Sequence, residues 1–213
     1  QMAVSSLGTF YNLEVSPEMV KGKKYNKDYF MNTSAALIGA LGSVVAAWHR
    51  IRNNQKPLAS NPESTYAENF LLMLGSDKIT PLMTRIMDAT LVLHGEHTIN
   101  ASTFTAMVTS STLANASQVV ASAIGSLSGP LHGGANEKVV SMLSKIDRKE
   151  DIRPWLDDTL KTKNVVWGMG HREYSVKDPR ANILTEMVQE LFNEREGGVT
   201  DIFEKAIELE KAC

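Results

Sequence analysis

Four of the five histidines in this 213-residue sequence lie in or beside short turns rich in glycine or polar residues. They are His94 and His97 in "LHGEH", His132 in "GPLHGG" and His171 in "GMGHRE". A histidine that only filled a core would sit more comfortably among branched apolar residues, as His49 does beside Trp48. The turns therefore indicate imidazoles that are presented for binding or for acid–base chemistry.

His132 precedes an expected helix, between a Gly-Pro pair and two further glycines. The positive end of a helix dipole disfavours an imidazolium, so the position favours a neutral ring. A neutral imidazole can still donate a hydrogen bond to a carbonyl oxygen that is becoming an enolate. The alternative is that the glycines only shape a connection between helices and that His132 caps the second one.

His94 and His97 are three residues apart, which on a helix would place both rings on one face and would also suit a metal ion. The pattern is not the H-E-x-x-H of zinc proteases, and no nearby cysteine adds a ligand. We therefore expect no metal site, and Glu96 between the two histidines points to another side.

The segment "GMGHREYSVKDPRA" places His171 in a glycine loop and Arg180 just inside a helix that begins with Asp178 and Pro179. A planar guanidinium that is held on a capped helix suits a substrate carboxylate. The alternative is a surface loop followed by an ordinary capped helix, because Asp-Pro is a common helix start.

Apolar residues recur at helical spacing along most of the chain, and no segment alternates as a strand does. The sequence therefore predicts an all-α fold. Helices are expected from caps at Asn32–Ser34 to Ile51, over residues 64–74 and 80–91, within 101–124, over 138–146 and 151–161, after Asp178, and from Thr200. The first of these should be central and buried, and the Ala/Ser/Thr-rich 101–124 region suits a tight interior or a subunit interface.

The bulk composition excludes several classes of partner. A net charge of −2 gives no electrostatic reason to expect nucleic acid or an anionic membrane. The apolar stretch Ala35–Trp48 is interrupted by glycine and is shorter than a membrane span, and the first residues do not form a signal peptide. The single cysteine, Cys213, fits a reducing compartment, so we expect a cytoplasmic protein.

Together, "LHGEHTINASTF", "GPLHGGANE" and "GMGHREYSVKDPRA" resemble the citrate synthase family, which includes 2-methylcitrate synthases. The upstream segment "VVAAWHRIRNNQKP…AENFLLML" is similar to the family as well, so the resemblance covers nearly the whole chain. It implies a multi-helical large domain, here residues 1–135, and part of a smaller helical domain, residues 136–213. It also implies a homodimer that condenses acetyl-CoA with oxaloacetate and holds no permanent cofactor.

The resemblance assigns roles to individual residues. His132 would stabilise the enolate of acetyl-CoA, and His171 would hold and polarise the oxaloacetate ketone, which makes these two the catalytic histidines. His97 and Arg180 would bind the oxaloacetate carboxylates, and His94 would act less directly. The segment that lines the adenine site of coenzyme A corresponds to Val165, Val166, Gly168, Met169 and Gly170.

The catalytic base of the family is an aspartate in a later segment, and no aspartate of this chain matches its motif. We therefore expect an internal piece of a longer enzyme that is inactive or nearly so by itself. Glu173 and Met169 also depart from the residues usual in the family. The alternative functions are a citryl-CoA lyase and a non-catalytic helical dimerisation module. No motif indicates whether the acyl donor is acetyl-CoA or propionyl-CoA.

Overall fold

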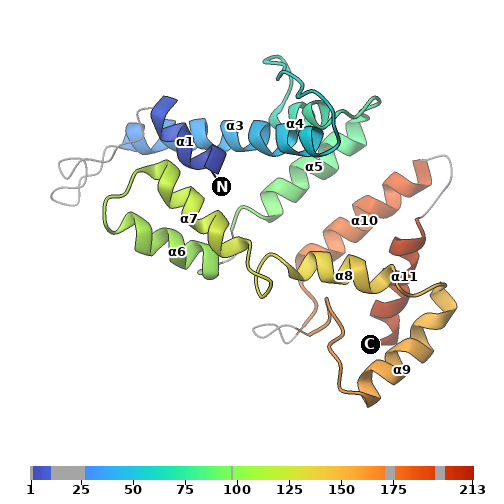
Figure 1. Cartoon of the computed structure of the whole chain (residues 1–213). Helices are drawn as coiled ribbons and strands as arrows, with labels where there is room; N and C mark the ends of the chain where they lie inside the picture. Colours follow the sequence, from blue (N-terminus) through green and yellow to red (C-terminus); the bar gives the residue numbers. More distant parts are fainter. Residues whose placement is uncertain (1, 11–26, 97, 171–175, 195–199) are drawn as a thin grey trace. The chain divides into compact units, whose positions relative to one another are not determined.

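The computed structural model describes residues 2–10, 27–96, 98–170, 176–194 and 200–213. All of the regular elements in these ranges are helical, which confirms the all-α prediction. The contacts divide the chain into two compact units, residues 1–128 and 129–213 (Figure 1). The large-domain and small-domain assignment, 1–135 and 136–213, stays a prediction.

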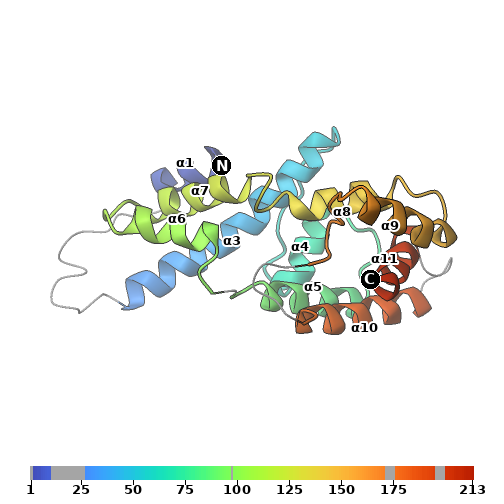
Figure 2. The same cartoon turned by 90° about the horizontal axis from the view of Figure 1, so that it is seen from below.

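The first unit contains six α-helices in its described part: α1 (Met2–Phe10), α3 (Lys27–Arg52), α4 (Tyr66–Leu74), α5 (Pro81–Leu93), α6 (Ala101–Ser110) and α7 (Ala116–Leu127). Helices α6 and α7 lie side by side in both views (Figures 1 and 2). Hydrogen bonds join them, among them one between the Thr109 and Ser122 hydroxyls at 2.9 Å and one from the Ser102 hydroxyl to the Ala123 carbonyl at 3.1 Å. The small side chains of this pair therefore serve a close helix–helix contact.

The predicted 101–124 stretch is two helices and not one. The chain turns at Leu113, whose φ is 61°, and restarts at Asn115. The Asn115 carboxamide oxygen accepts from the Ser117 amide at 2.8 Å, which caps α7. The Ser117 hydroxyl, which is fully buried, also donates to the Ser5 carbonyl of α1 at 3.2 Å. The break thus creates the docking point for α1.

Helix α3 differs from its prediction in its start and in its burial. It begins at Lys27, so Asn32–Ser34 lie inside it and are not caps; Asp28 in the first turn favours the earlier start. Several large apolar side chains are more than half exposed: Met31, Ile38, Val45, Trp48 and Ile51. The prediction of a buried helix is wrong for this chain. By length and composition α3 would satisfy the requirements of a membrane span, but core helices satisfy the same requirements.

The neighbouring helix α4 docks on α3 through a glycine contact. The Tyr66 hydroxyl donates to the Ile38 carbonyl at 2.8 Å, and a Cβ on Gly42 would lie only 2.7 Å from the tyrosine oxygen. Helix α4 ends at Leu74 and is followed by Gly75 as its C-cap, whose φ of 95° is left-handed. The predicted Thr80 cap and Pro81 start of α5 are confirmed, since the Thr80 hydroxyl accepts from the Met83 amide at 3.2 Å.

The second unit contains α8 (Ala135–Leu143), the short 3₁₀ helix η2 (Lys149–Asp151), α9 (Ile152–Lys161), α10 (Pro179–Glu194) and α11 (Asp201–Ala212). A single cluster of buried apolar side chains joins α8, α9, α11 and the loop after α9. Its members are Met142, Leu143, Ile146, Ile152, Leu156, Val166 and Leu209. Helix α8 begins three residues before its predicted start, and Pro154 lies in the first turn of α9 as predicted.

Candidate active site

The His132 turn is a compact loop that is closed on one carbonyl. The backbone amides of His132 and Gly134 both reach the Gly129 carbonyl, at 3.0 and 3.4 Å. A Cβ on Gly134 would lie 3.0 Å from the Pro130 Cα and 3.2 Å from its oxygen, so this close approach needs a glycine. The residues around His132 therefore set the path of the loop.

His132 lies immediately before α8, but it is not the N-cap residue. The N-cap is Gly134, which has no side chain to occupy the amides of the first turn. The His132 side chain is half-buried. Since the alternative reading of His132 required it to cap α8, the position of the cap favours presentation of the ring for binding.

His94 lies directly after α5 as its C-cap. Its Nδ1 lies 2.6 Å from the Thr90 carbonyl. A carbonyl only accepts, so Nδ1 is the donor in this hydrogen bond. Because α5 ends at Leu93, His94 lies outside this helix.

His97 and His171 lie outside the described residues, together with Glu173. In the sequence next to His97, the Thr98 amide donates to the Glu96 carboxylate. Asn100 caps α6, because its side chain accepts from the Thr103 amide at 3.0 Å. Among the described residues, no three His, Cys, Asp or Glu side chains cluster as a metal site would require.

Arg180 is held by its own helix cap. The Asp178 carboxylate accepts a hydrogen bond from the Arg180 backbone amide at 2.9 Å. It also accepts hydrogen bonds from Nε of the guanidinium at 3.0 Å and from Nη2 at 2.6 Å. Both side chains are about three-quarters buried, so this pair is better shielded from water than an exposed one. The predicted helix start at Pro179 is confirmed, and one carboxylate both caps α10 and orients Arg180.

This role of Asp178 was missed in the sequence. Asp178 was predicted only as a cap, although an arginine two residues after a capping aspartate was visible. The Nε–Nη2 edge of the Arg180 guanidinium is therefore occupied by Asp178. The guanidinium is thereby fixed in direction before any ligand arrives.

The loop predicted to line a coenzyme A site contains two left-handed glycines, Gly168 with φ 88° and Gly170 with φ 73°. Val166 is buried in the core cluster, and Trp167 and Met169 pack against that cluster, while Val165 is exposed. A Cβ on Gly168 would lie 3.1 Å from a methyl group of Val139 in α8. The loop is thus fixed on α8 and presents its backbone at the surface.

The structure places His132, the loop of residues 165–170 and Arg180 in the second unit, and His94 in the first. From the resemblance we also expect His97, His132, His171 and Arg180 to share one substrate cleft, and this stays a prediction because His97 and His171 lie outside the described residues.

Comparison with known proteins identifies the family. The family model "Citrate synthase, C-terminal domain" matches residues 1–213. Citrate synthase of Acidithiobacillus ferridurans is 41% identical over 98% of this chain and 53% of the relative. Citrate synthase of Synechocystis sp. is 42% identical over 99% of this chain and 51% of the relative. The chain therefore spans about half the length of these curated relatives.

Solved structures give the same result. The citrate synthase of Pyrobaculum aerophilum superimposes with a TM-score of 0.85, at 30% identity, over 99% of this chain and 53% of that chain. A ternary complex of the Thermoplasma acidophilum enzyme with carboxymethyl coenzyme A and oxaloacetate superimposes with a TM-score of 0.80, at 27% identity, over 98% of this chain and 52% of that chain. The exposed α3 is included in these matches, so it is part of the shared fold. The chain belongs to the citrate synthase family.

Proposed function

We propose that this chain forms part of an acyltransferase that condenses acetyl-CoA with oxaloacetate to give citrate and coenzyme A. The observation that carries the proposal is the match over nearly the whole chain to citrate synthases at 41–42% identity. The complex of a solved relative with a coenzyme A analogue and oxaloacetate supports the choice of substrates.

In this reaction a base removes a proton from the acetyl methyl group, and the thioester oxygen becomes an enolate oxygen. His132 donates a hydrogen bond to that oxygen, where negative charge develops. The methyl carbon then bonds to the ketone carbon of oxaloacetate, and the ketone oxygen, polarised by His171, takes a proton. Water finally cleaves the thioester, which releases citrate and coenzyme A.

Binding of oxaloacetate is assigned to His97 and Arg180, and binding of coenzyme A to the backbone of Val165, Val166, Gly168, Met169 and Gly170. The Asp178 carboxylate prepares Arg180 for this role, since it fixes the guanidinium on the first turn of α10. Coenzyme A thus enters as part of the substrate and not as a resident cofactor.

The 213 residues contain no aspartate that matches the family's base, so we propose that they turn over slowly or not at all by themselves. The test compares this chain with a longer product of the same reading frame in a citrate synthase assay. His132→Ala in the active form should lower kcat by about 10²–10³-fold, the loss typical of one oxyanion donor. His49→Ala, outside all three motifs, is the control.

The assay also separates the alternatives. Cleavage of citryl-CoA without condensation would indicate the lyase, and faster turnover of propionyl-CoA would indicate a 2-methylcitrate synthase. Failure of both forms to bind oxaloacetate in a calorimetric titration would contradict the proposal and favour a non-catalytic module.

We further propose that the active form is a homodimer that uses α6. Its outward face carries Phe104, Met107 and Val108, each more than half exposed. Apolar side chains at this spacing on one helix suit a contact with a second copy. Phe104→Glu should lower the dimer fraction in analytical ultracentrifugation, whereas Thr105→Glu on the same helix is the matched control.

A further inference from the structure

Helix α10 carries Arg180 at one end and its apolar anchor at the other. Of the 16 residues of α10, all of which the structure describes, only Phe192 is buried. The Phe192 ring lies 5.2 Å from the ring of Phe203 in α11, measured between centroids. Because Arg180 lies about 18 Å from Phe192 along the helix, a tilt of about 10° around Phe192 would move Arg180 by about 3 Å. A fixed position of Arg180 therefore requires a second attachment near the start of α10.

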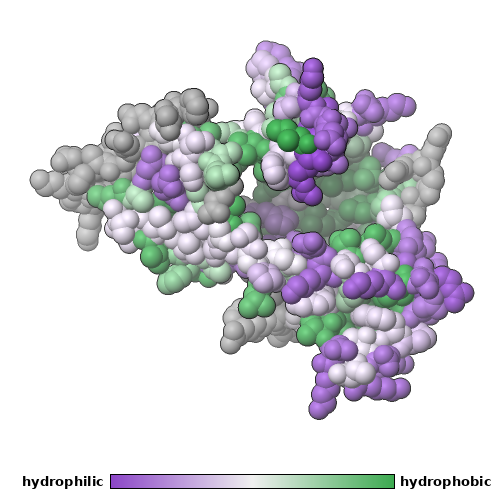
Figure 3. Space-filling model, viewed as in Figure 1, coloured by the Kyte–Doolittle hydropathy of each residue, from purple (hydrophilic) through white to green (hydrophobic). Residues whose placement is uncertain are grey.

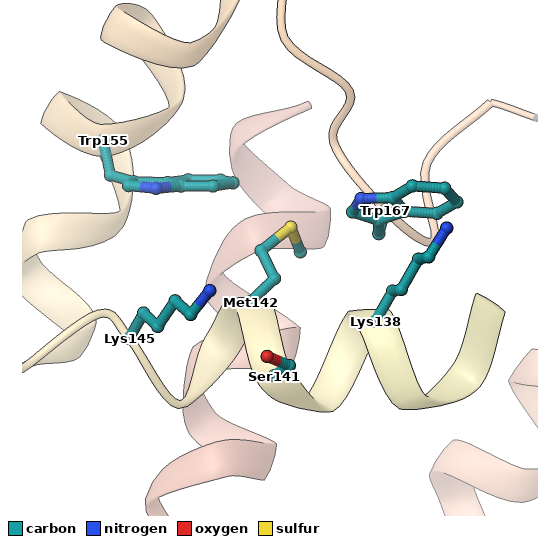
Figure 4. Close-up of a pocket in the computed structure, with 6 residues that line it drawn as sticks. All are labelled: Lys138, Ser141, Met142, Lys145, Trp155 and Trp167. Carbon is teal, nitrogen blue, oxygen red and sulfur yellow. The ribbon is translucent and has the colours of Figure 1, made fainter. Parts of the chain in front are cut away.

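The chain that leads to α10 is anchored in the core at its upstream end. Trp167 packs against the buried cluster of the second unit. Lys138 Nζ of α8 lies 4.0 Å from the centre of the Trp167 ring, a cation–π contact that Figure 4 shows. With Trp155, Lys145 and two further residues of α8, these side chains line a pocket of about 380 Å³. The upstream end is thus held by packing.

The downstream end of this chain segment is attached through charge. Val176 is 78% exposed, so this residue supplies no apolar anchor. The next residue, Lys177, forms an ion pair through Nζ with the carboxylate of Glu210 in α11. Lys177 directly precedes Asp178, whose carboxylate accepts hydrogen bonds from the Arg180 amide and guanidinium. The ion pair therefore joins α11 to the neighbour of the residue that orients Arg180.

We propose that Glu210 is a positioning residue for Arg180, and that through Lys177 it holds the first turn of α10 where Arg180 binds the substrate carboxylate. This inference rests on the proposed function, which assigns Arg180 to oxaloacetate. The two side chains of the pair are 41% and 37% exposed, so the pair contributes little to the stability of the whole unit. Its effect on binding is direct, because apparent affinity falls with the fraction of molecules in the binding-competent arrangement.

The first test measures the attachment in the 213-residue chain. Glu210→Gln removes the charge and keeps the shape of the side chain. Amide hydrogen exchange over residues 180–183 should become about threefold faster, because the first amides of α10 donate to Asp178 next to the lost attachment. Glu204→Gln is the matched control, since Glu204 lies on the same helix and forms a similarly exposed pair with Lys149 of η2.

The second test measures function in the longer, active form. Glu210→Gln should raise the KM for oxaloacetate about threefold and leave the KM for acetyl-CoA unchanged, and Glu204→Gln should change neither. Lys177→Met should have the same effect, and the double variant should be no worse than either single variant, because both remove one interaction. The difference from the unsubstituted enzyme should shrink in about 1 M salt, which screens an exposed ion pair.

Three results would overturn the proposal: unchanged exchange in Glu210→Gln, faster exchange with an unchanged KM for oxaloacetate, and additive losses in the double variant. In each case turnover by the unsubstituted longer form would still support the proposed function. Absence of that turnover would contradict the proposed function, and the exchange measurement would still decide whether Glu210 attaches α10.

Discussion

The two units of this chain are stabilised in different ways. In the first, small residues bring α6 and α7 together, and large apolar side chains such as Ile38, Trp48 and Phe104 remain exposed. In the second, a continuous apolar cluster is enclosed by its own helices, and the Lys149–Glu204 ion pair links η2 to α11. In Figure 3 the α6–α7 surface is mainly pale with apolar side chains at its edge, whereas strongly hydrophilic side chains gather at the lower right of the view and also at the top, near α4.

The difference is that the second unit encloses a cluster of apolar side chains among its own helices, whereas the first leaves a row of large apolar side chains on α3 and α6 exposed. Exposed apolar faces this large are typical of surfaces that another part of an assembly covers. We therefore expect the second unit to be the more stable when the chain is isolated, and the first to gain most from partners.

The largest expected effect comes from the enclosed core. Ile152→Ala removes a fully buried side chain and should destabilise the second unit by about 2–5 kcal/mol. Ile38→Ala on α3, where the side chain is 56% exposed, should change stability by less than about 0.5 kcal/mol. Hydrogen exchange of the α9 and α3 amides measures both, and equal losses would contradict the comparison.

A second change tests the close packing of the first unit. Ala121 in α7 is 3% exposed, so Ala121→Leu overfills the contact between helices and should cost about 1–3 kcal/mol. Ala35→Leu, at an exposed position of α3, is the matched control. If thermal unfolding shows no difference between these variants, small side chains are not what holds the first unit together.

A third change concerns the buried lysine of the second unit. The Lys205 side chain is 4% exposed and pairs with Asp201 at 2.5 Å. Asp201→Ala removes this partner of the ammonium group. The free energy of unfolding should fall by an amount near the lower end of about 1–3 kcal/mol, because Asp201 itself is mostly exposed. Asp157→Ala, which breaks the exposed pair with Arg153, should have little effect in urea unfolding. A larger loss from Asp157→Ala would reverse the expectation.

The smallest effect is a pH dependence. The side-chain hydrogen bonds from Arg148 hold the pKa of Asp151 below its usual value of 3.8. A lowered pKa in the folded state gives stability that is present above the unfolded value and is lost as pH falls through the folded value. Asp151→Asn should therefore reduce stability slightly at pH 7 and not at pH 2. Asp88→Asn in the first unit is the control, and a loss that persists at pH 2 would exclude this cause.

Much of the fold was predictable from local signals. The Thr80–Pro81 and Asp178–Pro179 starts depend on side chains that cap their own helix, so neighbouring residues suffice to define them. Thr200 is the N-cap residue of α11 at its predicted start, but its side chain makes no cap hydrogen bond. The break at Asn115 was missed, because its Ala- and Ser-rich surroundings are equally compatible with a continuous helix. The exposure of α3 was missed for another reason: apolar spacing reports which face would be buried and not whether a partner is present.

For the site, the sequence by itself determined the chemical groups, their order and the turns that present them, because glycine and cap requirements are local. Only the tertiary structure decided that Trp155 of α9 and Trp167 of the following loop line one pocket with Lys138 and Lys145. Such contacts depend on side-chain directions after helices have packed. Residue spacing along the chain does not contain that information.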